Sequence, residues 1–239
     1  MSVGLRLSAR IAKGVSVASD KDLKRDATYE QLLYDIICAE LAPGEWIDET
    51  ALAERYRTGR AGIRDALYRL SLEGLVERRP RVGTIISVPS FFELQEVFEL
   101  RVQIEGHCAA LAAKNARSTD IVAIKSAFVD AEQIIAESDW RTLVRCDLIF
   151  HRAMAAAARN QWLERTLVMA HNSGLRFWHH ALPRRPTDAV VNEIAIHRQV
   201  ADAIEAHDPP RAQAAMRILL GEFPATVRGL FNEPLEQHA

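Results

Sequence analysis

The chain has 239 residues, of which 49% are hydrophobic and 26% are charged, and its mean hydropathy is −0.09. This composition is typical of a globular protein with one or two domains and a substantial buried core. No apolar stretch is long enough to span a membrane, and the N-terminus lacks the continuous apolar segment of a signal peptide. We therefore expect a cytoplasmic protein with no membrane partner, and three widely separated cysteines, Cys38, Cys108 and Cys146, fit a reducing compartment.

Positive charge is concentrated in one window, although the net charge of the whole chain is −2. Residues 55–81 contain eight arginines and three acidic residues. Arginine is the side chain best suited to phosphate groups and to guanine edges. The window therefore predicts a local contact with nucleic acid rather than a protein covered by basic surface.

The first part of the chain predicts a winged helix-turn-helix. A basic N-terminal arm or a short pre-helix is expected over residues 1–27, with Thr28 as the N-cap of the first helix. The apolar spacing and the turn residues then predict helices over 29–41, 49–56 and 61–73 and a β-hairpin with strands over 75–79 and 84–88. This order of elements defines a DNA-binding domain over residues 28–88.

From Phe91 onward the pattern predicts only helices. Six amphipathic segments are expected, over 91–115, 119–137, 140–158, 161–182, 187–207 and 209–231. Prolines and capping residues mark the joints between them, and alanine-rich faces suit close packing. The predicted fold class is mostly α: a winged helix-turn-helix with a small β-hairpin wing, a linker over 89–91, and an all-α antiparallel six-helix bundle over 92–232.

Two arginines, Arg60 and Arg64, lie four residues apart at the start of the second helix of the helix-turn-helix. The N-terminal residues of this helix reach base edges in the major groove, so arginines one turn apart suit that role. On an arbitrary helix such a pair more often solvates the surface. Because three further arginines follow in the hairpin, at Arg78, Arg79 and Arg81, we favour DNA binding.

A resemblance to a known family lies in the stretch ICAELAPGEWIDETALAERYRTGRAGIRDALYRLSLEGLVERRPRVGTIISV. This stretch resembles the N-terminal domain of GntR-family transcriptional regulators, including the pattern R-x-x-x-R-x-A-L-x-R-L and a G-T in the wing. The resemblance implies contacts with double-stranded DNA at Thr50, Gly59, Arg60, Arg64 and Arg81. Gly59 departs from the family, in which most members have Ser or Thr, so a helix cap and a phosphate contact are expected to be missing.

The rest of the chain resembles the FCD domain, the helical ligand-binding domain of the FadR subgroup. The resemblance lies in RVQIEGHCAALAA, DLIFHRAMAAAARNQWL and EIAIHRQVADAIEAHDPPRAQAAM, in family order. Six helical segments fit the VanR-like branch better than the seven-helix acyl-CoA binder. The resemblance implies a ligand-responsive regulator, commonly a repressor, that binds a palindromic operator as a homodimer and responds to a small carboxylate metabolite.

A candidate metal site consists of Asp147, His151 and His197. Carboxylate and imidazole ligands suit Zn²⁺, Ni²⁺ or Mn²⁺, although an Asp/His pair four residues apart is more often a hydrogen-bonded helix pair. The resemblance favours the metal, because metal-binding FCD domains use this Asp-x-x-x-His pair and this later His. Their usual fourth ligand, a His, corresponds to Leu219 here. The three remaining residues either hold a metal with an open coordination position or leave the site without one.

Four other residues are candidates for the effector pocket. Arg101 either pairs with an anionic effector or forms an internal salt bridge with Glu105. His171, Asn172 and Arg176 are candidates for the wall or the mouth of the pocket.

The alternative function is a metal-dependent enzyme built on Asp147, His151 and His197. Such an enzyme needs an acid or base beside the metal, and the direct neighbours of His151 and His197 in the sequence provide none. An enzyme would also leave the winged helix without a role. An architectural DNA-binding protein with no effector is disfavoured because the helices of the bundle would then serve only to dimerise.

Overall fold

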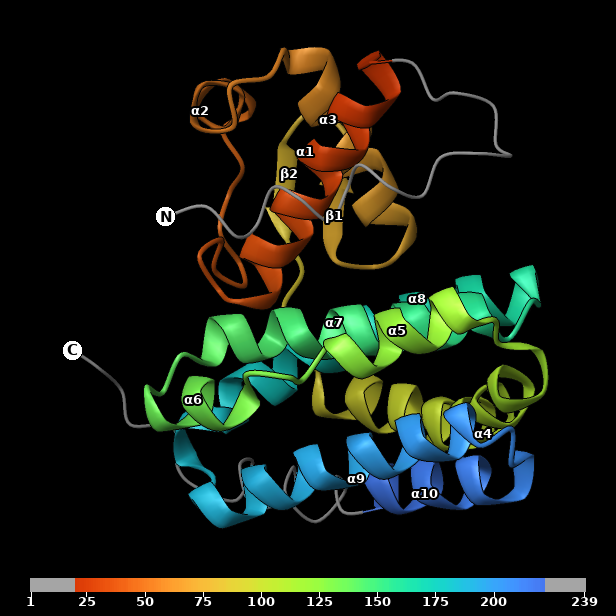
Figure 1. Cartoon of the computed structure of the whole chain (residues 1–239). Helices are drawn as coiled ribbons and strands as arrows, with labels where there is room; N and C mark the ends of the chain where they lie inside the picture. The colour runs from red at the N-terminus through yellow and green to blue at the C-terminus, as the bar shows by residue number, and fades with distance from the viewer. Residues whose placement is uncertain (1–19, 222–239) are drawn as a thin grey trace.

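The structure is a computed structural model that describes residues 20–221, with the side chains of residues 26–221. Figure 1 shows a winged helix-turn-helix stacked on one side of a helical bundle. The first domain consists of α1 (Asp20–Ile37), α2 (Glu49–Arg55), α3 (Arg60–Leu72), β1 (Val76–Arg79) and β2 (Gly83–Ile86). No helix within residues 20–221 combines the length and the apolar character needed to cross a membrane.

The core of the winged helix-turn-helix lies between α1 and α3. Leu32, Leu33 and Ile36 of α1 are buried there with Ile63 and Leu67 of α3, at the three- and four-residue steps that predict both helices. The two strands pair antiparallel, with Val76 opposite Ile86 and Arg79 opposite Gly83. Gly74 ends α3 in the left-handed conformation, with φ of 77°.

The first helix begins earlier than the sequence predicts. Thr28 lies inside α1 rather than at its N-cap, because the helix starts at Asp20 and takes in residues 20–27 of the predicted arm. These residues are mostly charged, so apolar periodicity starts only where the helix packs against its neighbours. Residues 1–19 of the arm lie outside the described part of the chain.

The bundle contains α4 (Phe91–Asn115), α5 (Ser118–Ser126), α6 (Ala131–Ala136), α7 (Trp140–Ala157), α8 (Gln161–Ala181), α9 (Thr187–Glu205) and α10 (Pro209–Gly221), with a short 3₁₀ turn at Leu182–Arg184. The central helix is α4, which contacts α7, α8, α9 and α10. The segment predicted as one helix over 119–137 is divided into α5 and α6. The chain turns between them, which buries Phe128 against Phe150 while Val129 stays exposed. Residues 222–232 of the last predicted segment lie outside the described residues.

The winged helix-turn-helix rests on α7 and α8 (Figure 1) through specific polar contacts. Asn172 of α8 donates a hydrogen bond to Glu73 Oε2 over 3.0 Å, and Tyr29 of α1 donates to Glu73 Oε1 over 2.5 Å. Arg176 donates to Ser87 Oγ over 3.0 Å and to the Ser87 carbonyl oxygen over 2.6 Å. Glu73 is the C-cap residue of α3, and Ser87 directly follows the second strand of the wing. Helix α8 therefore holds the end of the recognition helix and the end of the wing.

These contacts correct the prediction that Asn172 and Arg176 line the effector pocket. Both side chains are buried, but they point to the winged helix-turn-helix, which the local sequence does not indicate. Burial lowers the pKa of Arg176 to about 10, since its hydrogen-bond partners are the uncharged groups of Ser87. Glu73 lies 99 residues before Asn172 in the chain, and Ser87 lies 89 residues before Arg176.

Replacing Asn172 and Arg176 together by alanine is expected to loosen the winged helix-turn-helix from the bundle. Each lost hydrogen bond removes about 1 to 3 kcal/mol, so the DNA-binding domain should melt several degrees before the bundle. Differential scanning calorimetry measures this separation. Arg184→Ala, an exposed change beyond the end of α8, is the control. If the double variant melted in a single transition at the temperature of the parent, these two side chains would not hold the domains together.

Candidate functional site

The predicted DNA-contacting residues of α2 and α3 are exposed and already paired with one another. Arg60, the first residue of α3, donates a short hydrogen bond to Thr50 Oγ1 of α2. Arg64, one turn later, donates from Nε to Glu49 Oε2 over 2.7 Å. Both Nη groups of Arg64 are left to bind a base edge or a phosphate.

Sequence reasoning missed Glu49. An acidic residue beside Thr50 suggests repulsion from phosphate, and its pairing with Arg64 depends on the packing of α2 against α3. The consecutive residues Glu49 and Thr50 thus orient the two arginines of α3. The sequence signal for this role was the position of Glu49 and Thr50 at the start of α2, directly after the N-cap residue Asp48.

The start of α3 lacks a side-chain cap. Gly59 is its N-cap residue, with φ of −81° and ψ of 155°, and makes no side-chain hydrogen bond. By contrast, Asp48 caps α2 by accepting from the amides of Thr50 and Ala51 over 2.7 and 3.1 Å. A Cβ built on Gly59 meets nothing within 4 Å, so a serine would fit there.

The wing presents Arg81 at its tip. Arg81 adopts the left-handed conformation, with φ of 64°, in the turn between the strands, and it is exposed. Nearby on the first strand of the wing, Arg79 pairs with Glu77 over 3.0 Å.

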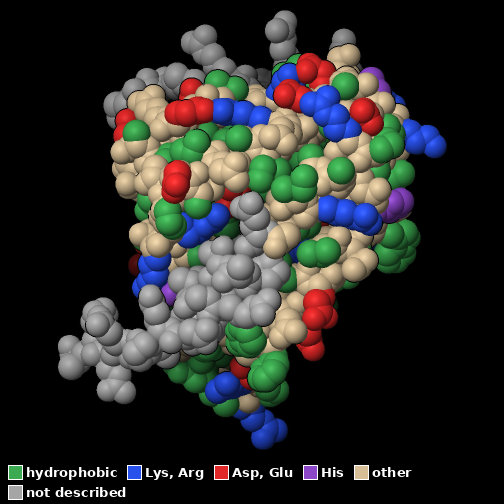
Figure 2. Space-filling view, turned by 90° about the horizontal axis from the view of Figure 1, so that it is seen from below, with side chains coloured by type: hydrophobic (Ala, Val, Ile, Leu, Met, Phe, Trp, Pro, Cys, Tyr) green, Lys and Arg blue, Asp and Glu red, His purple; other side chains and the backbone are tan. Residues whose placement is uncertain are grey.

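The face of the molecule opposite the winged helix-turn-helix, on the side of α9 and α10, shows acidic and basic side chains interspersed among hydrophobic ones (Figure 2). The described residues on that face mix both signs, unlike the arginine-rich window.

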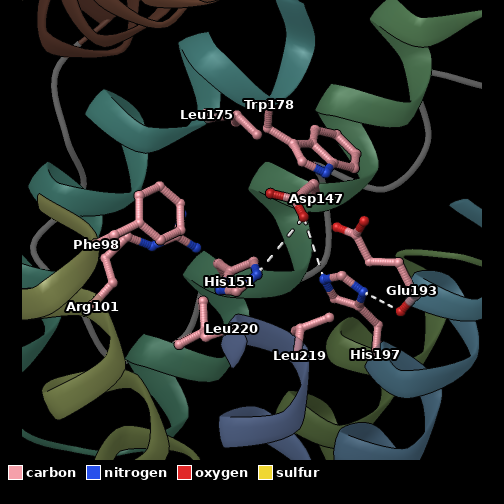
Figure 3. A pocket seen from close by; sticks show the side chains of 10 residues that line it. All are labelled: Phe98, Arg101, Asp147, His151, Leu175, Trp178, Glu193, His197, Leu219 and Leu220. Carbon is pink, nitrogen blue, oxygen red and sulfur yellow. Dashed lines mark hydrogen bonds and ion pairs between the residues drawn. The ribbon is translucent and has the colours of Figure 1, made fainter. Parts of the chain in front are cut away.

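The three predicted metal ligands converge inside the bundle. Figure 3 shows His151 and His197 pointing at Asp147 from α7 and α9. From Asp147 Oδ1, the Nε2 atoms of His197 and His151 are 3.3 and 3.7 Å away. One ligand atom from each of the three residues lies within 4.8 Å of the others, and all three side chains are buried.

The other nitrogen of each histidine is held by the bundle. His151 Nδ1 lies 2.9 Å from Glu105 Oε2, and His197 Nδ1 lies 2.8 Å from the carbonyl oxygen of Glu193. Metal-binding histidines are oriented in this way by a carboxylate or a carbonyl group on the far side of the ring. His197 Nε2 is thereby turned toward Asp147 Oδ1 in the buried centre of the bundle. The donor set therefore fits a divalent transition metal ion.

Both buried carboxylates favour the ionised form. Burial alone would raise the pKa of Asp147, but His151 and His171 outweigh it and hold this pKa well below its usual value. Burial opposes ionisation of Glu105 as well, and Arg101 and His151 lower its pKa. An ionised Asp147 is the form that binds a metal ion.

Arg101 and Leu219 both line the cavity beside the three ligands. Arg101 makes a short hydrogen bond to Glu105, so the internal salt bridge is present and the guanidinium also faces the pocket. Leu219 lies near His197, where the resemblance aligned it with the usual fourth ligand (Figure 3). The cavity measures about 30 Å³. That volume accepts a water-sized group or an ion, but not the carbon skeleton of a metabolite.

His171 differs from its predicted place on the pocket wall. Its Nε2 lies 2.7 Å from Asp147 Oδ2, and its ring stacks on His151 with centroids 4.2 Å apart. His171 is therefore a partner of the Asp147 carboxylate. No local sequence pattern indicates this contact, because it joins α7 to α8 across 24 residues.

Comparison with known proteins agrees with both halves of the structure. Residues 24–86 match the bacterial regulatory proteins of the gntR family, and residues 96–222, more than half of the chain, match the FCD domain. The chain belongs to the GntR family, with an FCD domain. It is thus a ligand-responsive DNA-binding transcriptional regulator and not an enzyme.

The curated relatives of this GntR-family regulator include two bacterial proteins. It is 28% identical over 206 residues to a probable D-xylose utilization operon transcriptional repressor of Paenarthrobacter nicotinovorans, covering 83% of this chain and 88% of the relative. It is also 28% identical over 221 residues to the HTH-type transcriptional regulator LutR of Bacillus subtilis (strain 168), covering 82% and 98%. Among solved structures, E. coli McbR/YncC has the same fold, with a TM-score of 0.76 at 16% identity over 87% of this chain and 99% of that one.

Replacing Glu49 with glutamine is expected to release Arg64 and weaken sequence discrimination. Loss of the negative charge should also strengthen binding to random DNA, because repulsion of phosphate falls. The ratio of specific to non-specific affinity should drop about tenfold, within the 1 to 3 kcal/mol of a base contact. Fluorescence anisotropy with a selected operator and a scrambled duplex measures the ratio. Glu54→Gln, an exposed change on the same helix, is the control, and an unchanged ratio for Glu49→Gln would reject the role.

Proposed function

We propose that this regulator is a repressor that binds a palindromic operator as a homodimer and is released by a small carboxylate metabolite. One recognition helix covers only a few base pairs, so two-fold proteins gain specificity from two half-sites. Support for repression comes from the relatives, several of which are described as transcriptional repressors. A regulator of this kind acts on chromosomal DNA in the cytoplasm.

The DNA contacts of this proposal are made by Arg60 and Arg64 in the major groove, by Arg81 at the minor groove, and by Thr50 and Gly59 at nearby phosphates. The observation that supports this assignment is the exposure of both arginines at the start of α3, held by α2. Gly59 offers only its backbone amide for such a contact.

The effector part of the proposal centres on Asp147, His151 and His197. These residues would hold Zn²⁺, Ni²⁺ or Mn²⁺, and a bound ion supplies a positive charge that attracts a carboxylate. The observation that carries this proposal is the convergence of three buried ligand atoms within 4.8 Å of one another, with His197 Nε2 facing Asp147 Oδ1 over 3.3 Å. Arg101 adds a second positive charge at the pocket.

Effector binding must enlarge the cavity, because about 30 Å³ does not hold a metabolite. Side chains of α8 and α10, including Leu175 and Leu219, form part of its walls. Since α8 also holds Glu73 and Ser87, a shift of this helix would alter the placement of the winged helix-turn-helix. The effector thereby favours a state with weaker operator binding.

Replacing Arg60 with alanine is expected to weaken operator binding by about 1 to 3 kcal/mol. The operator is first obtained by selection from a random duplex library and then titrated in a gel-shift assay. Gly59→Ser is the opposite change: it should tighten binding by restoring a cap and a hydroxyl that reaches phosphate. Equal affinities for the parent and Arg60→Ala would remove Arg60 from the interface.

Replacing Asp147 with asparagine is expected to abolish stoichiometric metal binding, since the near-isosteric amide lacks the charge of the carboxylate. Elemental analysis of protein purified without a nickel column and then loaded with Zn²⁺, Ni²⁺ or Mn²⁺ measures the content. Leu219→His should raise the affinity by adding an imidazole at the pocket. Equal metal content in the parent and Asp147→Asn would place the ion elsewhere.

A further inference from the structure

The two oxygens of Asp147 have different partners. Oδ1 is the oxygen near His197 and His151, at 3.3 and 3.7 Å. Oδ2 interacts with His171 Nε2 over 2.7 Å. His171 itself is buried, with 1% of its surface exposed, and it does not line the cavity. The carboxylate therefore lies between the predicted metal position and a buried third imidazole.

The protonation state of His171 follows from its surroundings. Its Nε2 lies 2.7 Å from Asp147 Oδ2, and its Nδ1 has no hydrogen-bond partner among the described residues, so the ring proton is placed on Nε2. A neutral imidazole has one N–H, and a nitrogen this close to an ionised carboxylate oxygen must be the donor. His171 Nε2–H thus donates to Asp147 Oδ2. The remaining Nδ1 is an acceptor, and it has no partner among the described residues although it is buried.

An unpartnered buried nitrogen destabilises the folded protein, and an apolar side chain at this position would avoid that cost. In His151 and His197, both ring nitrogens face a carboxylate or a backbone carbonyl oxygen. In His171, only Nε2 has such a partner, Asp147. The bond to Oδ2 is therefore the contact that accounts for a histidine here.

We propose that His171 is a positioning residue for the metal site: its Nε2–H holds Asp147 Oδ2, so that Oδ1 alone is presented to the ion. Asp147 then contributes one oxygen, and with His151 and His197 the protein supplies three ligand atoms. With leucine at position 219, the coordination sphere is completed from outside the protein. This inference rests on the metal binding proposed above.

Two substitutions separate positioning from direct ligation. His171→Ala removes the donor, and loss of such an outer partner lowers metal affinity by about 10- to 100-fold. His171→Gln places an amide N–H at a similar reach from the backbone, and a neutral amide is a weak ligand for transition metals. Glutamine should therefore restore the affinity close to that of the parent if His171 acts through Asp147. His180→Ala, an exposed change on α8, is the control.

The probe is Co²⁺ alone, titrated into metal-free protein in competition with a chromophoric chelator. Absorption bands of bound Co²⁺ report the ligand set, and they should be the same in the parent and His171→Gln. Thermal melting of each metal-free variant keeps loss of folding separate from loss of affinity. The expected order of affinity is parent and His180→Ala, then His171→Gln, then His171→Ala.

Two results would overturn the role of His171 alone. Parent-like affinity in His171→Ala would show that the bond to Oδ2 does not position the carboxylate. Equal losses in His171→Gln and His171→Ala, with altered Co²⁺ bands in the glutamine variant, would make His171 a direct ligand. Absence of Co²⁺ binding in the parent itself would overturn the proposed metal site together with this inference.

Discussion

The buried carboxylate of Glu105 is the constraint on which the centre of the bundle depends. It is fully buried and lies between the guanidinium of Arg101 and the Nδ1 atom of His151. An isolated ion in this position would be strongly destabilising, and removing one partner of a buried pair typically costs about 3 to 5 kcal/mol. Glu105 therefore fixes Arg101 at the cavity, and it also turns Nε2 of His151 toward Asp147. A single charge thus orients both the cation and one of the imidazoles of the site.

Helix α8 joins this centre to the DNA-binding domain. The adjacent residues His171 and Asn172 point to different partners, Asp147 in the bundle and Glu73 at the end of α3. Successive residues on an α-helix are separated by about 100°, so one helix can contact both domains at the same level. A small rotation or shift of α8 changes both contacts together, which gives ligand binding a direct physical route to the recognition helix.

Local patterns predicted the elements and the candidate ligands, but not the contacts between distant segments. The helices, the hairpin and the Asp147–His151 pair follow from periodicity and from family resemblance, because these signals lie within a few residues. The break between α5 and α6 was missed, since no proline or glycine marks residues 127–130. The partners of Asn172 and Arg176 were also missed, because burial against another domain depends on tertiary packing across about 90 residues or more.

The substitution at position 219 links the chemistry of the site to its mechanics. Where the family resemblance implies an imidazole, leucine adds an apolar wall to a cavity of about 30 Å³. A ligand that enters must displace this wall, and α10, which carries Leu219, packs against α4 and α9. Helix α4 begins at Phe91, a short distance after Ser87, which Arg176 holds. Movement of α10 can therefore reach the winged helix-turn-helix through α4 and the linker as well as through α8. The residue that leaves the proposed metal site with three protein ligands is also placed to make the bundle responsive to what binds there.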